Sequence, residues 1–529
     1  MTDLGQHPLD RRRFLGSSAT AGALALTGVA ASTAATGPVH AAVLGRRRLE
    51  LPSGVQTGDV TTGAAVLWAR SSGRGRLMAE VVSGRKRRRV RGPWATKDTD
   101  LTAKIALGGL APGREYAVEL AFEDEHGHRG ESQVATFRTA SVHPATTSFV
   151  WTGDTCGQGW GINPDLGGLV GYSAMHETRP DFFIHAGDTV YSDGPLAEQV
   201  TEPDGQVWRN VVTPEVSKVA ETLTEFRGRH RYNLLDENVR AMYAEVPVVA
   251  QWDDHETTNN WWAGEILDDP RYMQERRVDV LAARARRAWQ EYMPIADARA
   301  HRHGGGFAPA RIYRKIARGP KLDVFCLDMR TFKDPNTPGL EQEKTHILGE
   351  EQVDWLVREV SRSRATWKVI SADMPLGVVV PDGPVNQESL ANRDPGAPLG
   401  KELEIAEVLA AFKRNRVRNV VWITADVHYC AAHHYDPARA GFTDFDPFWE
   451  IVAGPIAAGT FGPNELDATF GPEVVFSKHA ASPNESPRRG NQFFGHAEIG
   501  ADGLLTVSLR DLTGAVLWSK DLEPQPGRH

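Results

Sequence analysis

The chain has 529 residues, which is long enough for one large domain of catalytic size and at least one smaller domain. Its residues are 41% apolar and 24% charged, a composition typical of folded globular proteins that excludes wholesale disorder. Because 60 basic residues face 68 acidic ones, the net charge of −8 argues against nucleic-acid binding as the main role. The three cysteines, Cys156, Cys326 and Cys430, are too few for a disulfide-held scaffold.

The N-terminus carries the pattern of an export signal. Arg11-Arg12-Arg13-Phe14-Leu15 contains a twin arginine, the short apolar run Leu24–Val29 follows, and Val39-His40-Ala41 offers small residues for cleavage. We therefore expect residues 1–42 to be a Tat export signal that the Tat translocase recognises, and the mature protein to be periplasmic, extracellular or associated with the cell wall. A membrane anchor is the alternative, but this run is too short and too rich in Gly and Thr to span a bilayer. We expect no stable membrane span elsewhere.

Residues 48–141 predict an all-β domain. Short apolar runs separated by polar or glycine-containing turns indicate strands, and they lie at Ala65–Trp68, Leu77–Val82, Glu115–Phe122 and Val134–Arg138. The segment from Leu110 to Tyr116 resembles the corner of fibronectin type III sandwiches, in which a tyrosine hydroxyl ties a crossing loop. The basic tract Arg85–Arg91 is either a solvated hairpin tip or a patch that contacts phosphate or another anionic surface.

Residues 146–522 predict an α/β domain, because apolar strands alternate with helical patterns. The predicted strands are Ser148–Trp151, Asp181–Ile184, Val246–Ala250, Leu322–Leu327, Trp367–Ile370 and Val417–Ile423, and the predicted helices are 167–178, 236–244, 350–362 and 400–414. Further strands at Trp449–Val452, Glu473–Phe476, Gly495–Ile499, Leu504–Leu509 and Val516–Lys520 are expected to complete a second sheet of the same domain. Functional residues are expected on the loops that leave the strand ends.

Nearly every predicted strand of the α/β domain ends in an acidic residue or a histidine. These strand ends are Thr152–Cys156, His185–Tyr191, Trp252–Asn260, Ser371–Pro375 and Thr424–His428. Five such ends at one edge would crowd carboxylates that repel one another, and a multivalent cation is the economical way to neutralise them. Oxygen ligands suit Ca²⁺, Mg²⁺ or Mn²⁺, whereas a thiolate and a phenolate beside a histidine suit Fe³⁺ or Zn²⁺. The mixed set predicts two or more metals of unlike character that share a carboxylate.

The order of these motifs resembles the calcineurin-like metallophosphatases in their alkaline phosphatase D (PhoD) form. The matching segments are Asp154-x-Cys156, Gly187-Asp188-x-x-Tyr191, Asp254-His255-Glu256, Asp373-x-Pro375 and Ala425-Asp426-x-His428. Four of their residues depart from the general superfamily pattern in a way that is characteristic of the PhoD branch: Cys156, Asp254, Asp373 and Asp426. The resemblance covers essentially the whole chain after the export signal. It implies a two-sheet αββα metallophosphatase sandwich at 146–522, preceded by a fibronectin-like or Ig-like domain at 48–141.

The resemblance also implies roles for individual residues. A ferric ion would be held by Cys156, Asp188, Tyr191 and His428. One or more calcium ions would be held by Asp154, Asp188 and Asp426 together with either Asp254 or Asn259, and other divalent metals would also fit. His255 would stabilise the transition state or protonate the leaving oxygen, and Asp188 would be the bridging carboxylate, so these two are the expected catalytic residues.

The implied activity is hydrolysis of phosphomonoesters and phosphodiesters, in small molecules, polymers or lipids, with a metal-bound oxygen as nucleophile rather than a serine. Hydrolysis of lipid head groups or teichoic acids on the same site is an alternative. A catalytically silent exported binding module is another, and it predicts that Asp188→Ala leaves the physiological role intact.

Two alternative roles are open for several residues near the motifs. Cys156 is either a ligand or a buried apolar residue, and Tyr191 either reaches the same ion or packs. Arg227, Arg231 and Arg240 either clamp phosphate or are solvated on a charged helix. Cys326 and Cys430 are expected in the core. Four tryptophans either form an apolar rim for the organic part of a phosphodiester or simply pack; they are Trp160, Trp252, Trp261 and Trp262.

Overall fold

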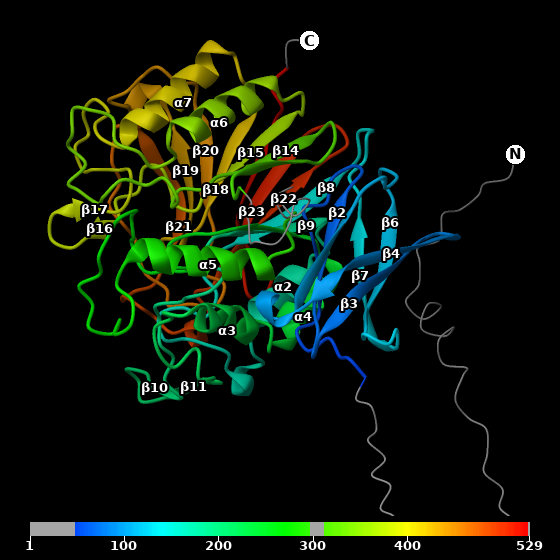
Figure 1. Cartoon of the computed structure of the whole chain (residues 1–529). Helices are drawn as coiled ribbons and strands as arrows, with labels where there is room; N and C mark the ends of the chain where they lie inside the picture. Colours follow the sequence, from blue (N-terminus) through cyan, green and yellow to red (C-terminus); the bar gives the residue numbers. More distant parts are fainter. Residues whose placement is uncertain (1–47, 297–310, 527–529) are drawn as a thin grey trace, which may run out of the picture.

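The computed structural model describes residues 48–296 and 311–526, so the predicted export signal at 1–42 lies outside the described residues. The described chain is of mixed α/β class, with two large sheets, a smaller sheet at the N-terminal side and helices over the large sheets (Figure 1). Within these ranges no helix combines the length and the apolar character that crossing a bilayer requires.

The first large sheet has the order β24-β23-β22-β8-β9-β12-β1-β2-β5. Its strands are β1 (Val55–Gly58), β2 (Ala65–Arg70), β5 (Thr102–Leu107), β8 (Thr147–Thr152), β9 (Phe182–Ala186), β12 (Val248–Gln251), β22 (Phe493–Ile499), β23 (Leu505–Asp511) and β24 (Val516–Leu522). Strands β8, β9 and β12 are parallel neighbours, with Phe149 opposite Phe182 and Val248 opposite Phe183. Their carboxyl ends therefore meet at one edge.

The second large sheet has the order β13-β14-β15-β18-β20-β19-β21. Its strands are β13 (Arg314–Ala317), β14 (Leu322–Cys326), β15 (Trp367–Ser371), β18 (Val420–Thr424), β19 (Cys430–Tyr435), β20 (Phe448–Val452) and β21 (Pro472–Lys478). Strands β14, β15, β18 and β20 run parallel. The strands after residue 445 therefore divide between the sheets: β20 and β21 join the second, whereas β22, β23 and β24 extend the first.

Hydrophobic clusters define how the layers pack. Residues of the first sheet, such as Trp151 and Ile184, form one cluster with residues of the second, such as Val421 and Ile451, so the two sheets pack face to face. The opposite face of the first sheet packs against α2 (Val170–Glu177), α3 (Leu223–Asn233), α4 (Glu237–Glu245) and α5 (Val278–Tyr292). The opposite face of the second sheet packs against α6 (Glu350–Arg362) and α7 (Glu402–Arg414) (Figure 1).

The N-terminal part is all-β, as predicted. A four-stranded sheet of β3 (Gly75–Ser83), β4 (Lys86–Ala95), β6 (Glu115–Glu123) and β7 (Arg129–Arg138) shares a core with β1, β2 and β5. The hydroxyl of Tyr116 accepts a hydrogen bond from the backbone N–H of Ala111 at 2.8 Å, which confirms the predicted corner. Two short ribbons lie in loops, namely β10 (Gln199–Thr201) with β11 (Val207–Arg209) and β16 (Pro381–Asp382) with β17 (Asn386–Gln387).

Helices α3 and α5 are absent from the predicted set. In α3 the sequence LTEFRGRHRYN has no apolar stripe at helical spacing, yet Arg229 and His230 are buried. A capping box between Thr222 and Glu225 starts this helix, so its start depends on local hydrogen bonds that hydrophobic periodicity does not reveal.

Candidate metal centre

The predicted strand ends converge, but from two sheets rather than one. Asp154 and Asp188 follow β8 and β9 of the first sheet, whereas Asp373 and Asp426 follow β15 and β18 of the second. Within each sheet the loops are joined by a backbone hydrogen bond, from Thr155 to the carbonyl of Asp188 and from Ala425 to the carbonyl of Asp373, both at 3.0 Å. Between the sheets, the backbone N–H of Ala457, which follows β20 of the second sheet, donates to the carbonyl of Asp154 at 3.1 Å. The carboxyl edges of both sheets therefore form one acidic centre.

Close approach of the loops explains a glycine before Asp154. A Cβ atom on Gly153 would lie 2.6 Å from the Cβ of Ala425, closer than carbon atoms can approach without displacement. Glycine at this position lets the end of β8 in the first sheet contact the end of β18 in the second.

Four of the acidic or histidine residues have left-handed backbones. Their φ angles are 67° at Asp154, 49° at Asp188, 68° at Asp426 and 59° at His428. Residues other than glycine adopt this region at an energetic cost, and such strain gathers at functional sites. The surrounding loops therefore hold these side chains in directions that unconstrained chain would rarely adopt.

The first group of potential ligands joins Asp154, Asp188 and His428, each offering an atom within 4.8 Å of the others. The hydroxyl oxygen of Tyr191 lies 2.7 Å from Nε2 of His428 and 3.4 Å from Oδ1 of Asp154. On the other side of the imidazole ring, Nδ1 of His428 lies 2.5 Å from the carbonyl oxygen of Gly459, which orients Nε2 toward the group. Two carboxylates, an imidazole and a phenol thus meet.

The second group consists of carboxylates around Asp254. Asp254 joins Asp188 and His255 in one set and Asp253 and Asp426 in another, again with the offered atoms within 4.8 Å. Asp188 therefore belongs to both the first group and the second. Asp188 would therefore be available to ions held by either group.

Several carboxylate oxygens of these groups are buried without a hydrogen bond, as expected of residues that hold a cation. Oδ2 of Asp154, Oδ1 of Asp254 and Oδ2 of Asp426 are buried and have no hydrogen-bond partner among the described residues. Burial and the charges of Asp254 and Asp253 raise the pKa of Asp188 well above its usual range, and burial and Asp253 do the same for Asp154. Buried oxygens are normally satisfied, and a cation would satisfy these and offset the repulsion. The residues fit metal binding.

His255 lies beside both groups, and Asp193 positions it. Nδ1 of His255 is 2.8 Å from Oδ1 of Asp193, and the ring lies over that of Tyr191 with centroids 4.2 Å apart. Although burial lowers the pKa of His255, the negative charges of Asp193 and Asp254 raise it to about 10. Asp193 is absent from the predicted site; it stands two residues after Tyr191, on the loop that the second motif already marks.

Arg330, Asp253 and Glu388 are not among the predicted site residues, whereas Asp373 and Asp426 belong to the predicted motifs. Arg330 contacts Asp253, Asp373, Glu388 and Asp426. It lies four residues after the end of β14, a strand whose end carries none of the predicted motifs. The available signal was positional, because β14 is parallel to β15 and its carboxyl end reaches the same edge.

Two predicted ligands lie elsewhere. Cys156 is 5% exposed and belongs to the hydrophobic cluster over the first sheet, and its Sγ is not in either ligand group. Burial raises the pKa of its thiol well above the usual range, which favours the neutral form. Of the two alternatives in the third motif, Asp254 lies within the second group, whereas Asn259 is exposed and donates its backbone N–H to Asp193 at 2.8 Å.

The three arginines upstream of Asp254 neither clamp the centre nor stand free in solvent. Arg227 pairs with Glu291 at 2.6 Å, Arg231 pairs with Glu215 at 2.8 Å, and Arg240 donates to the carbonyl of Leu234 at 2.9 Å. These contacts tie helices α3 and α4 to their neighbours, so the arginines have structural roles.

Three of the four tryptophans near the motifs are buried in the protein and form no exposed rim; the fourth, Trp262, is half-buried. Trp160, Trp252 and Trp261 are buried. Nε1 of Trp252 donates to Oδ1 of Asp328 at 2.9 Å. Cys326 and Cys430 are confirmed as core residues between the sheets.

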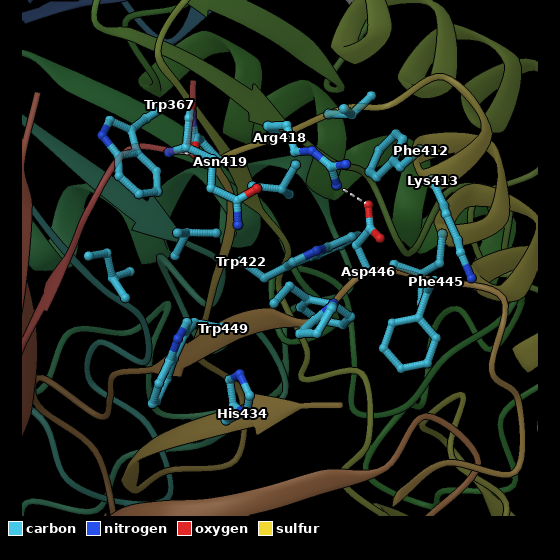
Figure 2. Close-up of a pocket in the computed structure, with 18 of the residues that line it drawn as sticks. Trp367, Phe412, Lys413, Arg418, Asn419, Trp422, His434, Phe445, Asp446 and Trp449 are labelled. Atoms are coloured by element: carbon cyan, nitrogen blue, oxygen red, sulfur yellow. Dashed lines mark hydrogen bonds and ion pairs between the residues drawn. The ribbon is translucent and has the colours of Figure 1, made fainter. Parts of the chain in front are cut away.

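A cavity of about 500 Å³ lies away from the metal centre (Figure 2). Arg418 and Asn419, which immediately precede β18, line it together with Trp422 and Trp449, whereas Asp426 and His428 follow the other end of β18. Arg418 and Asp446 form an ion pair at its wall (Figure 2). The chemistry of the carboxylate groups, and not the volume of this cavity, therefore locates the candidate site.

The chain matches known proteins along most of its length. The family model described as PhoD-like phosphatase matches residues 149–509, and the model of its N-terminal domain matches residues 38–141. The chain is 26% identical over 452 residues to alkaline phosphatase D of Bacillus subtilis (strain 168), covering 79% of this chain and 71% of that protein.

Solved structures share the fold. The structure of PhoD superposes with a TM-score of 0.65 at 20% identity, covering 89% of this chain and 88% of that one. The purple acid phosphatase PPD1 from yellow lupin (Lupinus luteus) seeds superposes with a TM-score of 0.55 at 12% identity, covering 89% and 74%. The family model spans more than half of the chain, so this protein belongs to the PhoD-like phosphatase family and is a metal-dependent phosphoric ester hydrolase.

Proposed function

We propose that the chain is an exported alkaline phosphatase and phosphodiesterase whose two ligand groups hold unlike metal ions. The observation that carries the proposal is the meeting of Asp154, Asp188 and His428 within 4.8 Å, with Asp188 shared with the carboxylates around Asp254. Such a pair of ions, when bound, supplies charge neutralisation and an activated water for displacement at phosphorus.

The first group suits a ferric ion. Asp154, Asp188, His428 and Tyr191 offer two carboxylates, an imidazole and a phenol, a donor set suited to a strongly Lewis-acidic ion. This set places Asp154 where the resemblance implied Cys156, and it leaves the thiol in the apolar cluster. The proposed ferric ligands are therefore Asp154, Asp188, Tyr191 and His428.

The second group suits calcium or another hard divalent ion. Asp188, Asp254 and Asp426 offer only carboxylate oxygens, the ligands that Ca²⁺, Mg²⁺ and Mn²⁺ prefer. Asp254 replaces Asn259 as the proposed ligand of the third motif, because only Asp254 is buried among the carboxylates.

His255 and Asp193 would handle the leaving group. Asp193 engages Nδ1 and fixes the ring, so Nε2 is the nitrogen available to an ester oxygen. Without a cation, the charges of Asp193 and Asp254 outweigh burial and raise the pKa of His255 to about 10, which favours the protonated imidazole that a donor to the leaving oxygen must be. The proposed role of His255 is therefore general acid or stabiliser of the developing negative charge.

The test is hydrolysis of p-nitrophenyl phosphate and bis-p-nitrophenyl phosphate before and after chelation, with Asp188→Asn as the variant. We expect chelation and the variant each to lower kcat at least ~10³-fold, since each removes charge neutralisation in the transition state. Re-addition of Fe³⁺ and Ca²⁺ to the chelated wild type should restore activity. Full activity of the Asp188→Asn variant would contradict the proposal and favour a silent site.

The fold and the export of the chain complete the proposal. The two face-to-face sheets with helices on their outer faces support assignment to the αββα metallophosphatase sandwich, with residues 48–141 as its N-terminal domain and 146–522 as its catalytic domain. The twin arginine at Arg11-Arg12 supports Tat export. Replacing both arginines by lysine should retain the protein in the cytoplasm, which cell fractionation measures. Unchanged export of this variant would exclude the Tat route.

A further inference from the structure

The hairpin of β3 and β4 carries the basic tract Arg85–Arg91, which has no role in the proposed function. Ser83 lies opposite Lys86 in the register, so Gly84 and Arg85 form a two-residue turn between the strands. Figure 1 shows the joined ends of the two strands projecting from the N-terminal sheet. A Cβ atom on Gly84 would meet no described atom within 4 Å, so the turn is open to solvent.

The hairpin holds six basic residues, and all of them are exposed: Arg85, Lys86, Arg87, Arg88, Arg89 and Arg91. Within the described ranges, Glu80 is the one carboxylate that pairs with them, at 2.9 Å from Arg87 and 3.2 Å from Arg89. Arg88 donates instead to the carbonyl of Gly108 at 3.1 Å. Four of the six cations therefore have no carboxylate partner among the described residues.

The carboxylates on the neighbouring strand β6 are already paired with other arginines. Glu119 lies 2.9 Å from Arg129, and Glu115 lies 3.9 Å from Arg138. Although the whole chain has a net charge of −8, the hairpin is thus a local site of positive charge. Like charges in such proximity repel one another, and an anion that spans several of them relieves the repulsion.

Protection of the sheet edge does not account for this charge. Strand β4 is an edge strand of its sheet, and charged side chains on an edge hinder pairing with another chain. That protection needs only scattered charges of either sign. Here one sign occupies six of the seven positions 85–91, an excess that indicates an anionic partner.

The arrangement fits a linear polyanion better than a flat membrane. Arg87 and Arg89 share the face of Glu80, whereas Arg88 lies on the opposite face, which packs into the core. A flexible polymer can follow cations on both faces of a narrow ribbon, but a flat surface meets only one face. Residues 83–89 also contain no apolar side chain that could insert between lipids.

Five of the six cations are arginines, which suits phosphate as the partner group. A guanidinium offers a planar pair of donors that binds two oxygens of one phosphate. Alternate side chains of a strand are about 6.5 Å apart, so successive arginines on one face can each engage a different charge of an extended polymer. Because the chain is a phosphoric ester hydrolase, a polymer of phosphodiester groups matches both its chemistry and this surface.

We propose that the β3–β4 hairpin is a binding surface, outside the metal centre, for a linear polymer of phosphodiester groups. The phosphates of the polymer engage above all the cations without a carboxylate partner: Arg85, Lys86, Arg88 and Arg91. Binding there requires no metal ion, so the inference goes beyond the proposed function and does not depend on it. Where the polymer is also a substrate, the surface raises its local concentration around the enzyme.

The test measures binding of fluorescein-labelled poly(glycerol phosphate) to the metal-replete protein by fluorescence anisotropy over a series of salt concentrations. The variant carries four substitutions, Arg85→Gln, Lys86→Gln, Arg88→Gln and Arg91→Gln. We expect its affinity at low salt to fall at least ~10-fold, and its plot of log K against log salt concentration to be less steep by about 3, because four fewer contacts release counterions. The kcat and KM for p-nitrophenyl phosphate should stay at their wild-type values.

The matched control removes four exposed cations at or just after the C-terminal ends of α6 and α7: Arg362→Gln, Arg364→Gln, Arg414→Gln and Arg416→Gln. It changes the net charge by the same amount as the hairpin variant. Its affinity for the polymer should therefore remain close to that of wild type. If the hairpin variant does not fold, Arg85→Gln with Lys86→Gln, confined to the turn and the residue after it, gives the same comparison with a smaller effect.

Four results would overturn the inference. The first is an unchanged affinity in a folded hairpin variant, and the second is an equal loss of affinity in the control, which would show a response to net charge alone. The third is equally tight binding of poly-glutamate of the same length, which would remove the preference for phosphate. The fourth is hairpin-dependent binding to phosphatidylglycerol vesicles without binding to the polymer, which would assign the surface to a membrane.

Failure of this inference and failure of the proposed function can be told apart. A wild type that binds the polymer but hydrolyses no ester would refute the proposed function and leave the binding surface in place. A wild type that hydrolyses p-nitrophenyl phosphate but does not bind the polymer would refute the binding surface alone.

Discussion

The neighbours of Tyr191 determine whether its phenol can ionise. Its hydroxyl meets Nε2 of His428 at 2.7 Å, although 237 residues separate the two in the chain. Its ring packs against that of His255, so this one aromatic side chain contacts both the first ligand group and the proposed general acid. Without a cation, burial and the charge of Asp188 raise the pKa of Tyr191 well above its usual range. An ionised phenol at this position therefore requires a bound cation.

Tyr191→Phe tests the proposed ferric ligand. The ring contact with His255 should survive, so we expect the variant to fold with a free energy of unfolding within ~2 kcal/mol of wild type. The visible absorption of a ferric phenolate in the concentrated protein should disappear, and kcat should fall about 10-fold to 100-fold. A wild type that is active but colourless, or a variant that keeps the colour, would contradict this assignment.

Cys156→Ala separates the two readings of the thiol. Because Sγ lies in the apolar cluster, we expect iron content to remain at the wild-type level and the free energy of unfolding to fall by about 1 kcal/mol. Elemental analysis and urea unfolding measure the two effects. Cys326→Ala is a matched control, since Cys326 is a buried core thiol between the sheets. Loss of iron in the Cys156 variant alone would restore the thiol as a ligand.

Helix α3 shows that an element can be built from charged residues whose partners lie elsewhere. Arg227 and Arg231 on this helix pair with Glu291 and Glu215. His230 is buried, its ring lies parallel to that of Tyr292 at 5.3 Å, and its Nδ1 finds no hydrogen bond among the described residues. Burial, followed by the charge of Arg231, lowers the pKa of His230 to about 3. The helix therefore requires a neutral imidazole.

His230→Phe should weaken the dependence of stability on acid pH. Between pH 6.5 and 3 the unfolded chain binds a proton at His230 that the folded protein does not, so wild-type stability falls as the pH falls through this window. Between pH 7 and pH 5 the wild type should lose about 2 kcal/mol more than the variant. Urea unfolding of both proteins at the two pH values gives this difference, and equal losses would show that His230 does not titrate on unfolding.

At the scale of the whole molecule, the two predicted domains share one sheet. Strand β1 of the N-terminal part pairs with β12, with Gly58 opposite Val248. A Cβ atom on Gly58 would lie 2.4 Å from the carbonyl oxygen of Pro294, so the backbones touch at this seam. Trp68 is fully buried, and its Nε1 donates to the carbonyl of Glu291 in α5 at 2.7 Å. The N-terminal strands therefore complete the core of the catalytic part.

Deletion of residues 48–141 should abolish folding of the remainder. The deletion would expose the edge of β12 and the cavity left by Trp68, and a cavity of this size alone costs about 3–5 kcal/mol. We expect the intact protein to unfold in one calorimetric transition and the deleted protein to show none. A deleted protein that unfolds cooperatively and hydrolyses p-nitrophenyl phosphate would show that the two parts are independent.

By itself the sequence determined the element types, the order of the motifs and the kind of chemistry, because hydrophobic periodicity and acidic strand ends are local properties. The parallel strands β8, β9, β15 and β18 lie where their apolar runs predict them. Only the tertiary structure decided that the motifs come from two sheets, that Asp254 rather than Asn259 lies among the carboxylates, and that Cys156 packs in the apolar cluster. The position of Arg330 beside these carboxylates was likewise decided only by the tertiary structure. The direction of a side chain at a strand end depends on backbone angles and on residues distant in the chain, which local pattern does not encode.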